Sequence, residues 1–95
     1  MALKVDEPRK ILVRATNWIG DAVISLPALE ALRARFPEAD LVVVSKPWVR
    51  GVYERHPAID RQILFDPQGE HRGPGGFRKL VRQLREEEFD LAILL

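Results

Sequence analysis

Residues 11–36, ILVRATNWIGDAVISLPALEALRARF, carry the strongest structural signal in the chain. The first five of them, 11–15, form a short apolar run rich in branched side chains, which is typical of a buried strand. A polar loop follows over residues 16–21. Beyond the loop, apolar side chains recur at spacings of three and four and predict an amphipathic helix. These side chains are Val23, Leu26, Leu29, Leu32 and Phe36.

Two prolines bear on this helix. Pro27 lacks the N–H that would bond to the carbonyl of Val23, so we expect a bend or a tightened first turn there. Pro37 disfavours helical geometry at the preceding residue, so the helix should end near Phe36.

The rest of the chain repeats the alternation of strand and helix. Further apolar runs predict strands at residues 41–44, 62–65 and 90–95. Helices are expected at 48–55 and, after a loop rich in Gly and Pro at 66–76, at 77–84. Strands that alternate with helices imply a parallel sheet covered on both faces. The predicted fold class is therefore α/β, with a Rossmann-like sheet.

Composition excludes several function classes. The 15 Lys and Arg residues nearly balance the 14 Asp and Glu residues, and the net charge of +1 gives no general reason to expect nucleic acid or an anionic membrane as partner. The absence of cysteine from the sequence excludes a disulfide scaffold and Cys-ligated metal sites. No apolar run approaches the roughly 18 to 20 residues of a membrane span. With no signal-peptide pattern in residues 1–10, we expect a cytosolic protein.

The loop after the first strand is the predicted binding site, because open α/β sheets bind ligands at the carboxyl ends of their strands. Thr16 and Asn17 offer hydrogen-bond donors and acceptors, and Gly20 allows the backbone to approach a ligand closely. Asp21 has two open interpretations. It is a residue type preferred at the N-cap of a helix, which pattern alone favours, and it is also a carboxylate that can face a ligand. Neither a Rossmann glycine fingerprint nor a P-loop is present.

These residues also carry a family resemblance. The segments ILVR at 11–14, WIGDAV at 18–23 and LPALEAL at 26–32 resemble the amino-terminal signature of the ADP-heptose:lipopolysaccharide heptosyltransferases of glycosyltransferase family 9. The Phe36-Pro37 pair, the strand from Leu41 and the Pro47-Trp48 pair resemble the heptosyltransferase II branch. The similarity runs from about Lys10 to the end of the chain.

The resemblance implies the amino-terminal, acceptor-binding half of a two-domain GT-B glycosyltransferase. The catalytic aspartate of the family falls on Asp21, which would act as the general base in an inverting transfer. Thr16, Asn17 and Trp18 match the segment that lines the cleft. The implied donor substrate is ADP-heptose, the implied acceptor is the lipopolysaccharide inner core, and no cofactor or metal is required.

A second candidate region lies at the other end of the sequence. Arg72, Arg78 and Lys79 flank the Gly-rich loop, and arginine forks suit the phosphate and carboxylate groups of the implied acceptor. A solvated helix face is the open alternative for these three side chains, and of them we expect Arg72 and Lys79 to bind acceptor. Trp48 is expected to pack under the short helix. His71 has no partner at metal-ligand spacing, so no zinc site is predicted.

Residue 95 lies inside the last predicted strand. We therefore expect residues 1–95 to be a truncated amino-terminal domain, without the donor-binding domain and inactive alone. Contact with the inner membrane from the cytosolic side is a further expectation. Two alternatives stay open: a related glycosyltransferase acting on another glycan, and a stand-alone flavodoxin-like binding domain. The reading frame downstream of Leu95 separates the last of these from a transferase.

Overall fold

The computed structural model describes residues 8–15 and 17–95. The strands are parallel and form one four-stranded sheet in the order β3-β2-β1-β4. The elements in chain order are β1 (Lys10–Arg14), α1 (Ile19–Arg35), β2 (Asp40–Ser45), the 3₁₀ turn η1 (Pro47–Val49), α2 (Arg50–Tyr53), β3 (Arg61–Leu64), α3 (Gly73–Glu87) and β4 (Leu91–Leu94). The predicted α/β class and parallel sheet are confirmed.

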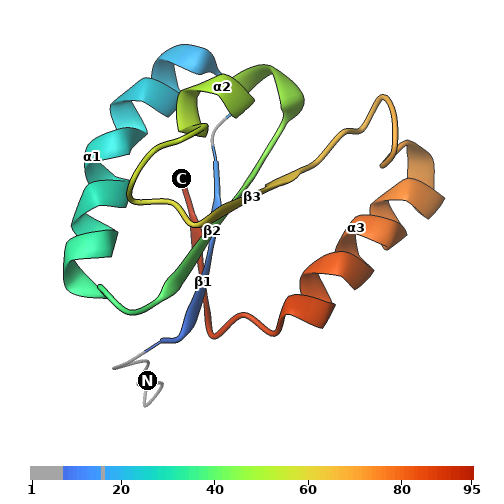
Figure 1. The fold of residues 1–95 in the computed structure, drawn as a ribbon. Helices are drawn as coiled ribbons and strands as arrows, with labels where there is room; N and C mark the ends of the chain where they lie inside the picture. The colour runs from blue at the N-terminus through green and yellow to red at the C-terminus, as the bar shows by residue number, and fades with distance from the viewer. Residues whose placement is uncertain (1–7, 16) are drawn as a thin grey trace.

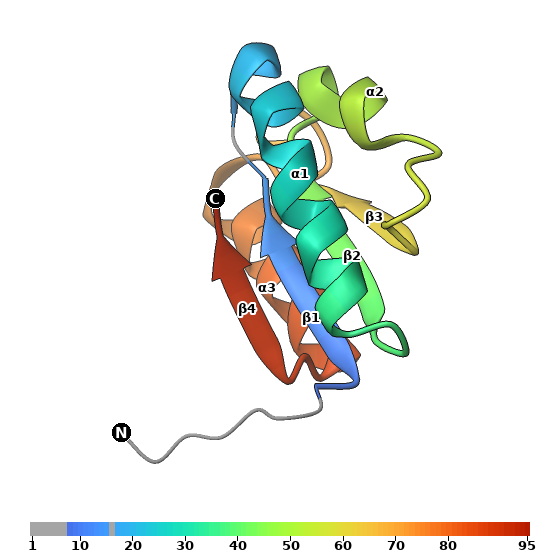
Figure 2. The ribbon, with the colours of Figure 1, turned by 90° about the vertical axis from the view of Figure 1, so that its left-hand side faces the viewer.

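Helices cover both faces of the sheet. Helices α1 and α2 lie on one face and α3 lies on the other (Figure 1). In Figure 2 the strand arrows all point the same way, with β1 between β2 and the edge strand β4. The apolar runs of β1 and β2 are explained by this arrangement, because a parallel strand inside such a sheet is buried from both sides.

Each face of the sheet has its own core. Under α1 and α2, the side chains of Ile11 and Val13 pack with Leu29 and Tyr53. Under α3, the core is smaller and is built around Val42, Val44, Ile63 and Leu80.

The orientation of α1 corrects one prediction. Val23 was expected on the buried stripe, but it is 52% exposed, whereas Ala22 is fully buried. Adjacent positions are separated by about 100° around a helix, so apolar spacing alone does not separate them. The small side chain of Ala22 is the one that meets the core. Pro27 lies inside α1 as predicted, and the helix ends at Arg35 with Phe36 as its C-cap.

Helix α3 begins at Gly73, four residues earlier than predicted. The sequence placed residues 73–76 in the loop because they are Gly, Pro, Gly and Gly. Pro74 instead occupies the first turn of α3, where the missing N–H costs nothing. Gly73 has a φ of +67°, which favours glycine at this turn into the helix.

Gly76 should be the glycine in this segment that is most sensitive to substitution. A Cβ at Gly76 would lie 2.2 Å from the backbone carbonyl carbon of His71, whereas a Cβ at Gly75 would meet nothing within 4 Å. We expect Gly76→Ala to lower the free energy of unfolding by more than 1 kcal/mol, within the range of overpacking, about 1–3 kcal/mol. Gly75→Ala, the matched control, should be neutral or stabilising. Equal urea midpoints for the two variants would contradict this packing.

The amino ends of the strands are joined by ionic contacts. The Arg61 guanidinium donates to the carboxylates of Asp40 and Glu87, and Lys10 also pairs with Glu87 at 2.9 Å. The Asp60 carboxylate accepts hydrogen bonds from the Leu41 N–H and from Arg33. Burial works to raise the pKa of Asp60, but these two hydrogen bonds, together with the positive charges of Arg33 and Arg61, outweigh it and lower that pKa. Every charged group in this set is engaged, so this edge of the sheet has a structural role.

The same cluster predicts a pH dependence. The hydrogen bonds from Arg61 and then Lys10 lower the pKa of Glu87 from its ordinary 4.5 to about 2. Because the folded-state pKa is the lower one, this stabilisation is present above pH 4.5 and is lost as the pH falls toward 2. The urea unfolding midpoint of the parent chain should fall as the pH is lowered through that window. The midpoint of the Glu87→Gln variant should fall less steeply. Glu86→Gln, at the exposed neighbouring position, should behave like the parent chain. If the urea midpoint of Glu87→Gln fell with pH as steeply as that of the parent chain, Glu87 would not be the source of the pH dependence.

Candidate functional site at the carboxyl ends of the strands

The loops that carry the predicted site lie together at the opposite end of the sheet, where the strands have their carboxyl ends. The strands point toward this end of the sheet (Figure 2), where residues 15 and 17–21 follow β1, residues 46–48 follow β2 and residues 65–72 follow β3. The Trp48 Nε1–H donates to the backbone oxygen of Asn17 at 2.6 Å, which joins the first two of these segments.

Asp21 lies in the first turn of α1, and the N-cap interpretation is wrong. The helix begins at Ile19, so Trp18 is the N-cap, and its side chain makes no capping hydrogen bond. Asp21 is exposed, and its carboxylate makes no hydrogen bond or ion pair within residues 8–15 and 17–95. The helix dipole favours a negative charge in this turn. The result is a carboxylate with free lone pairs beside the predicted ligand-binding loop, as a general base requires.

The other predicted loop residues are less constrained. Thr16 lies outside the described residues. Asn17 is half-buried, and Trp18 is 73% exposed. A Cβ at Gly20 would meet nothing within 4 Å, so no close contact among the described residues requires glycine there. Trp18 is therefore placed where its ring is accessible to a ligand, whereas no packing reason for Gly20 emerges.

The expectation for Trp48 is only partly correct. It was expected to pack under the short helix, but its side chain is 49% exposed at the start of η1. Its ring lies 5.3 Å from the Lys46 ammonium, which is a cation–π distance. Pro47 and Trp48 open the 3₁₀ turn directly after β2, so the ring stays at the rim of the sheet.

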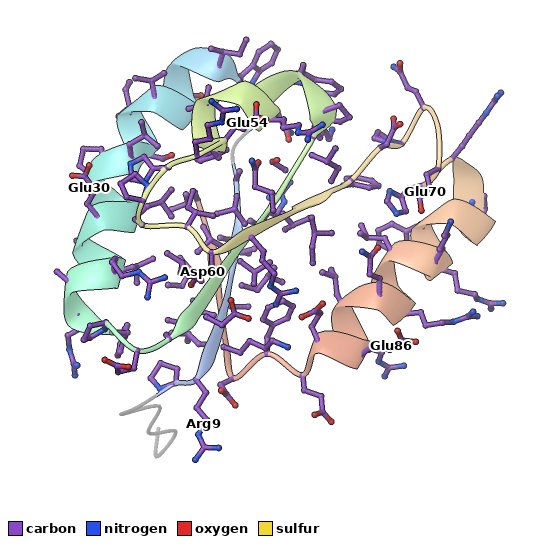
Figure 3. All side chains as sticks on the ribbon, in the orientation of Figure 1. Arg9, Glu30, Glu54, Asp60, Glu70 and Glu86 are labelled. Atoms are coloured by element: carbon purple, nitrogen blue, oxygen red, sulfur yellow. The ribbon has the colours of Figure 1, made fainter. Side chains whose placement is uncertain are left out.

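Arg72 and Lys79 are not brought together with Asp21. They lie before and within α3, on the face of the sheet opposite α1 (Figure 1). Lys79 pairs with the Glu70 carboxylate at 2.8 Å, and this contact lowers the pKa of Glu70. Figure 3 shows Glu70 on the loop that leads into α3. Arg72 is exposed and makes no ion pair within the described part of the chain.

A cavity of about 340 Å³, which was not predicted from the sequence, lies between the sheet and α3. Arg14, the last residue of β1, and Lys46, the first residue after β2, both line it. Neither side chain makes an ion pair within residues 8–15 and 17–95. Their positions at the ends of neighbouring strands were the signal available in the sequence, because ligands bind there.

The described residues contain no group of three His, Asp or Glu side chains placed to hold a metal ion. His71 is buried, and its Nδ1 accepts the Asp66 N–H at 3.0 Å, so it supports the loop before α3. In the same described residues, none of the helices has the length and apolar character needed to cross a bilayer.

Comparisons with known proteins give the chain its relatives. No family model matches it. Lipopolysaccharide heptosyltransferase 2 of Escherichia coli K12 is 34% identical over 86 residues, which are 90% of this chain and 25% of that protein. The enzyme of the same name from Salmonella typhimurium is 33% identical over the same share of each chain. The chain is homologous to lipopolysaccharide heptosyltransferase 2.

Solved structures agree with this homology. The structure of E. coli ADP-heptose lps heptosyltransferase II matches with a TM-score of 0.71 and 34% identity, over 90% of this chain and 24% of that one. A glycosyltransferase of family 9 from Veillonella parvula matches with a TM-score of 0.85 and 28% identity, over 100% of this chain and 28% of that one. The chain spans about a quarter of the length of its heptosyltransferase 2 relatives.

Proposed function

We propose that this chain is the amino-terminal, acceptor-side domain of an inverting GT-B glycosyltransferase. The whole enzyme would transfer heptose from ADP-heptose to the inner core of lipopolysaccharide. The observation that carries the proposal is the 34% identity to E. coli lipopolysaccharide heptosyltransferase 2 over 90% of the chain, together with the shared fold. ADP-heptose would be the donor substrate, held by a second domain, and no further cofactor takes part.

The chemistry assigned to this chain is proton removal by Asp21. The carboxylate takes the proton of an acceptor hydroxyl while the hydroxyl oxygen attacks the anomeric carbon of the heptose. The bond from that carbon to the diphosphate breaks on the opposite face, and ADP leaves with the electron pair. The exposure of Asp21 and its lack of a partner among the described residues support this role, because neither a competing donor nor a cap occupies its oxygens.

The acceptor would lie along the carboxyl edge of the sheet. Asn17 and Trp18 border Asp21. Thr16, which lies outside the described residues, is proposed as part of the same loop from its place in the sequence. Arg72 and Lys79 would meet anionic groups of the acceptor farther from the reacting hydroxyl, since they lie toward α3. Glu70 holds Lys79 in the ion pair described above, so Arg72 is the cation better able to accept a phosphate.

Because the proposed acceptor is carried by a lipid, we place the enzyme in the cytoplasm, in peripheral contact with the inner membrane. The test is complementation of a bacterial strain that lacks heptosyltransferase 2. The whole reading frame that encodes this chain should restore full-length lipopolysaccharide, and residues 1–95 expressed alone should not. A reading frame that fails to restore it, although the protein is made and folded, would overturn the proposed function. Restoration by residues 1–95 alone would overturn the two-domain account.

A further inference from the structure

The cavity between the sheet and α3 has an apolar interior. Leu80 and Leu84 of α3 face Leu12 of β1 across it. Phe65 and Phe77 close one side, with their rings edge to face and their centroids 6.4 Å apart. Pockets of about 300 Å³ or more with mostly apolar walls and few polar groups are typical of small-ligand sites.

Two cations, Arg14 and Lys46, line the cavity at the carboxyl ends of the strands, the part called its mouth below. Arg14 and Lys46 stand at the ends of neighbouring strands, since Arg14 is in register with Val44. The Lys46 ammonium lies 5.9 Å from the centroid of the Phe65 ring, so the charge sits directly beside the apolar wall. Neither cation has an ion-pair partner within residues 8–15 and 17–95, whereas Arg61 and Lys10 at the opposite edge are paired with carboxylates.

We propose that this cavity binds a small amphipathic anion, with an apolar body inside and a phosphate group held at the mouth by Arg14 and Lys46. A volume of about 340 Å³ corresponds to roughly ten water molecules of liquid, and so to a body of about ten heavy atoms. The apolar walls argue against a free inorganic phosphate, and the unpaired cations argue against a neutral hydrocarbon.

This site is separate from Asp21. Asp21 does not line the cavity, and its helix α1 covers the opposite face of the sheet, but Asn17 of the proposed acceptor loop does line it. The cavity therefore adjoins the proposed acceptor site, and the inference concerns binding in the cavity, which is measured without heptosyl transfer. Two sources of ligand share the proposed chemistry: a soluble aromatic phosphate, and the chain and headgroup of a lipid phosphate.

Isothermal titration calorimetry on the protein expressed from the whole reading frame tests the proposal, after circular dichroism has shown cooperative unfolding. The probes are 1-naphthyl phosphate for the soluble source and monomeric decyl phosphate for the lipid source. Neutral 1-naphthol and inorganic phosphate are the matched probes that lack one half of the ligand. At least one amphipathic probe should bind roughly tenfold or more tightly than both of these, and the tighter one identifies the source.

Variants locate the site. Arg14→Gln combined with Lys46→Gln should weaken binding of the better probe roughly tenfold or more. The control is the double variant Arg50→Gln and Arg82→Gln, which removes the same charge from positions that do not line the cavity. It should change the affinity for the better probe less than twofold, about the limit of the measurement. Amide shifts in NMR spectra should move at Phe65, Phe77 and Leu84. The proposal is overturned by no binding of either probe, by equal losses in the two double variants, or by shifts confined to α1.

Discussion

Asp21→Asn in the protein expressed from the whole reading frame should reduce kcat for heptosyl transfer by about 10²–10⁴-fold. Asparagine keeps the size of the side chain but cannot take up the proton of the acceptor hydroxyl. Because Asp21 is exposed and makes no contact with a polar partner among the described residues, its replacement should cost only the favourable interaction with the helix dipole, at most about 1 kcal/mol, and the protein should stay folded. The measurement is steady-state turnover with ADP-heptose, together with a thermal unfolding scan.

The matched control for this variant is Glu38→Gln, which also neutralises an exposed carboxylate just beyond the end of α1. Turnover of this control should equal that of the parent enzyme. If Asp21→Asn retained most of the parental turnover, Asp21 would not be the base. If both variants lost turnover equally, net charge rather than proton transfer would be responsible.

Leu29→Ala should produce the largest loss of stability among single changes in α1. Leu29 is fully buried against the sheet in the core formed with Ile11 and Val13. Truncation leaves a cavity and should lower the free energy of unfolding by about 3 kcal/mol. For a domain of this size, that corresponds to a fall of about 12–24 °C in melting temperature. Thermal unfolding followed by circular dichroism measures it.

Ile24→Ala is the control on the same helix, because Ile24 is 76% exposed. Its effect should stay within about 0.5 kcal/mol. Equal melting temperatures for Leu29→Ala and Ile24→Ala would show that α1 does not pack on the sheet through Leu29.

Most of the fold was accessible from sequence because buried parallel strands produce continuous apolar runs. The runs at 11–15 and 41–44 predicted β1 and β2 to within one or two residues, and Pro37 correctly predicted the end of α1. The errors arose where local chemistry is ambiguous. Residues 73–76 have the composition of a loop, yet a proline and a positive-φ glycine begin a helix there.

The candidate site was less predictable from the sequence, because it depends on which side chains form hydrogen bonds and ion pairs in the fold. Asp21 matched the preferences of an N-cap, and only the observed start of α1 at Ile19 shows that it does not serve as one. Lys79 resembled a free cation in the sequence, but Glu70, nine positions earlier, pairs with it. Arg14 was counted as part of a buried strand, yet its side chain reaches the cavity mouth. Such pairings require the positions of two segments in space.

The most direct test of the central claim is a mass measurement of the acceptor after incubation with ADP-heptose and the purified protein from the whole reading frame. We expect the lipopolysaccharide inner-core acceptor to gain the mass of one heptose for each ADP released. Release of ADP without a gain in acceptor mass, or no reaction by a folded protein, would contradict it.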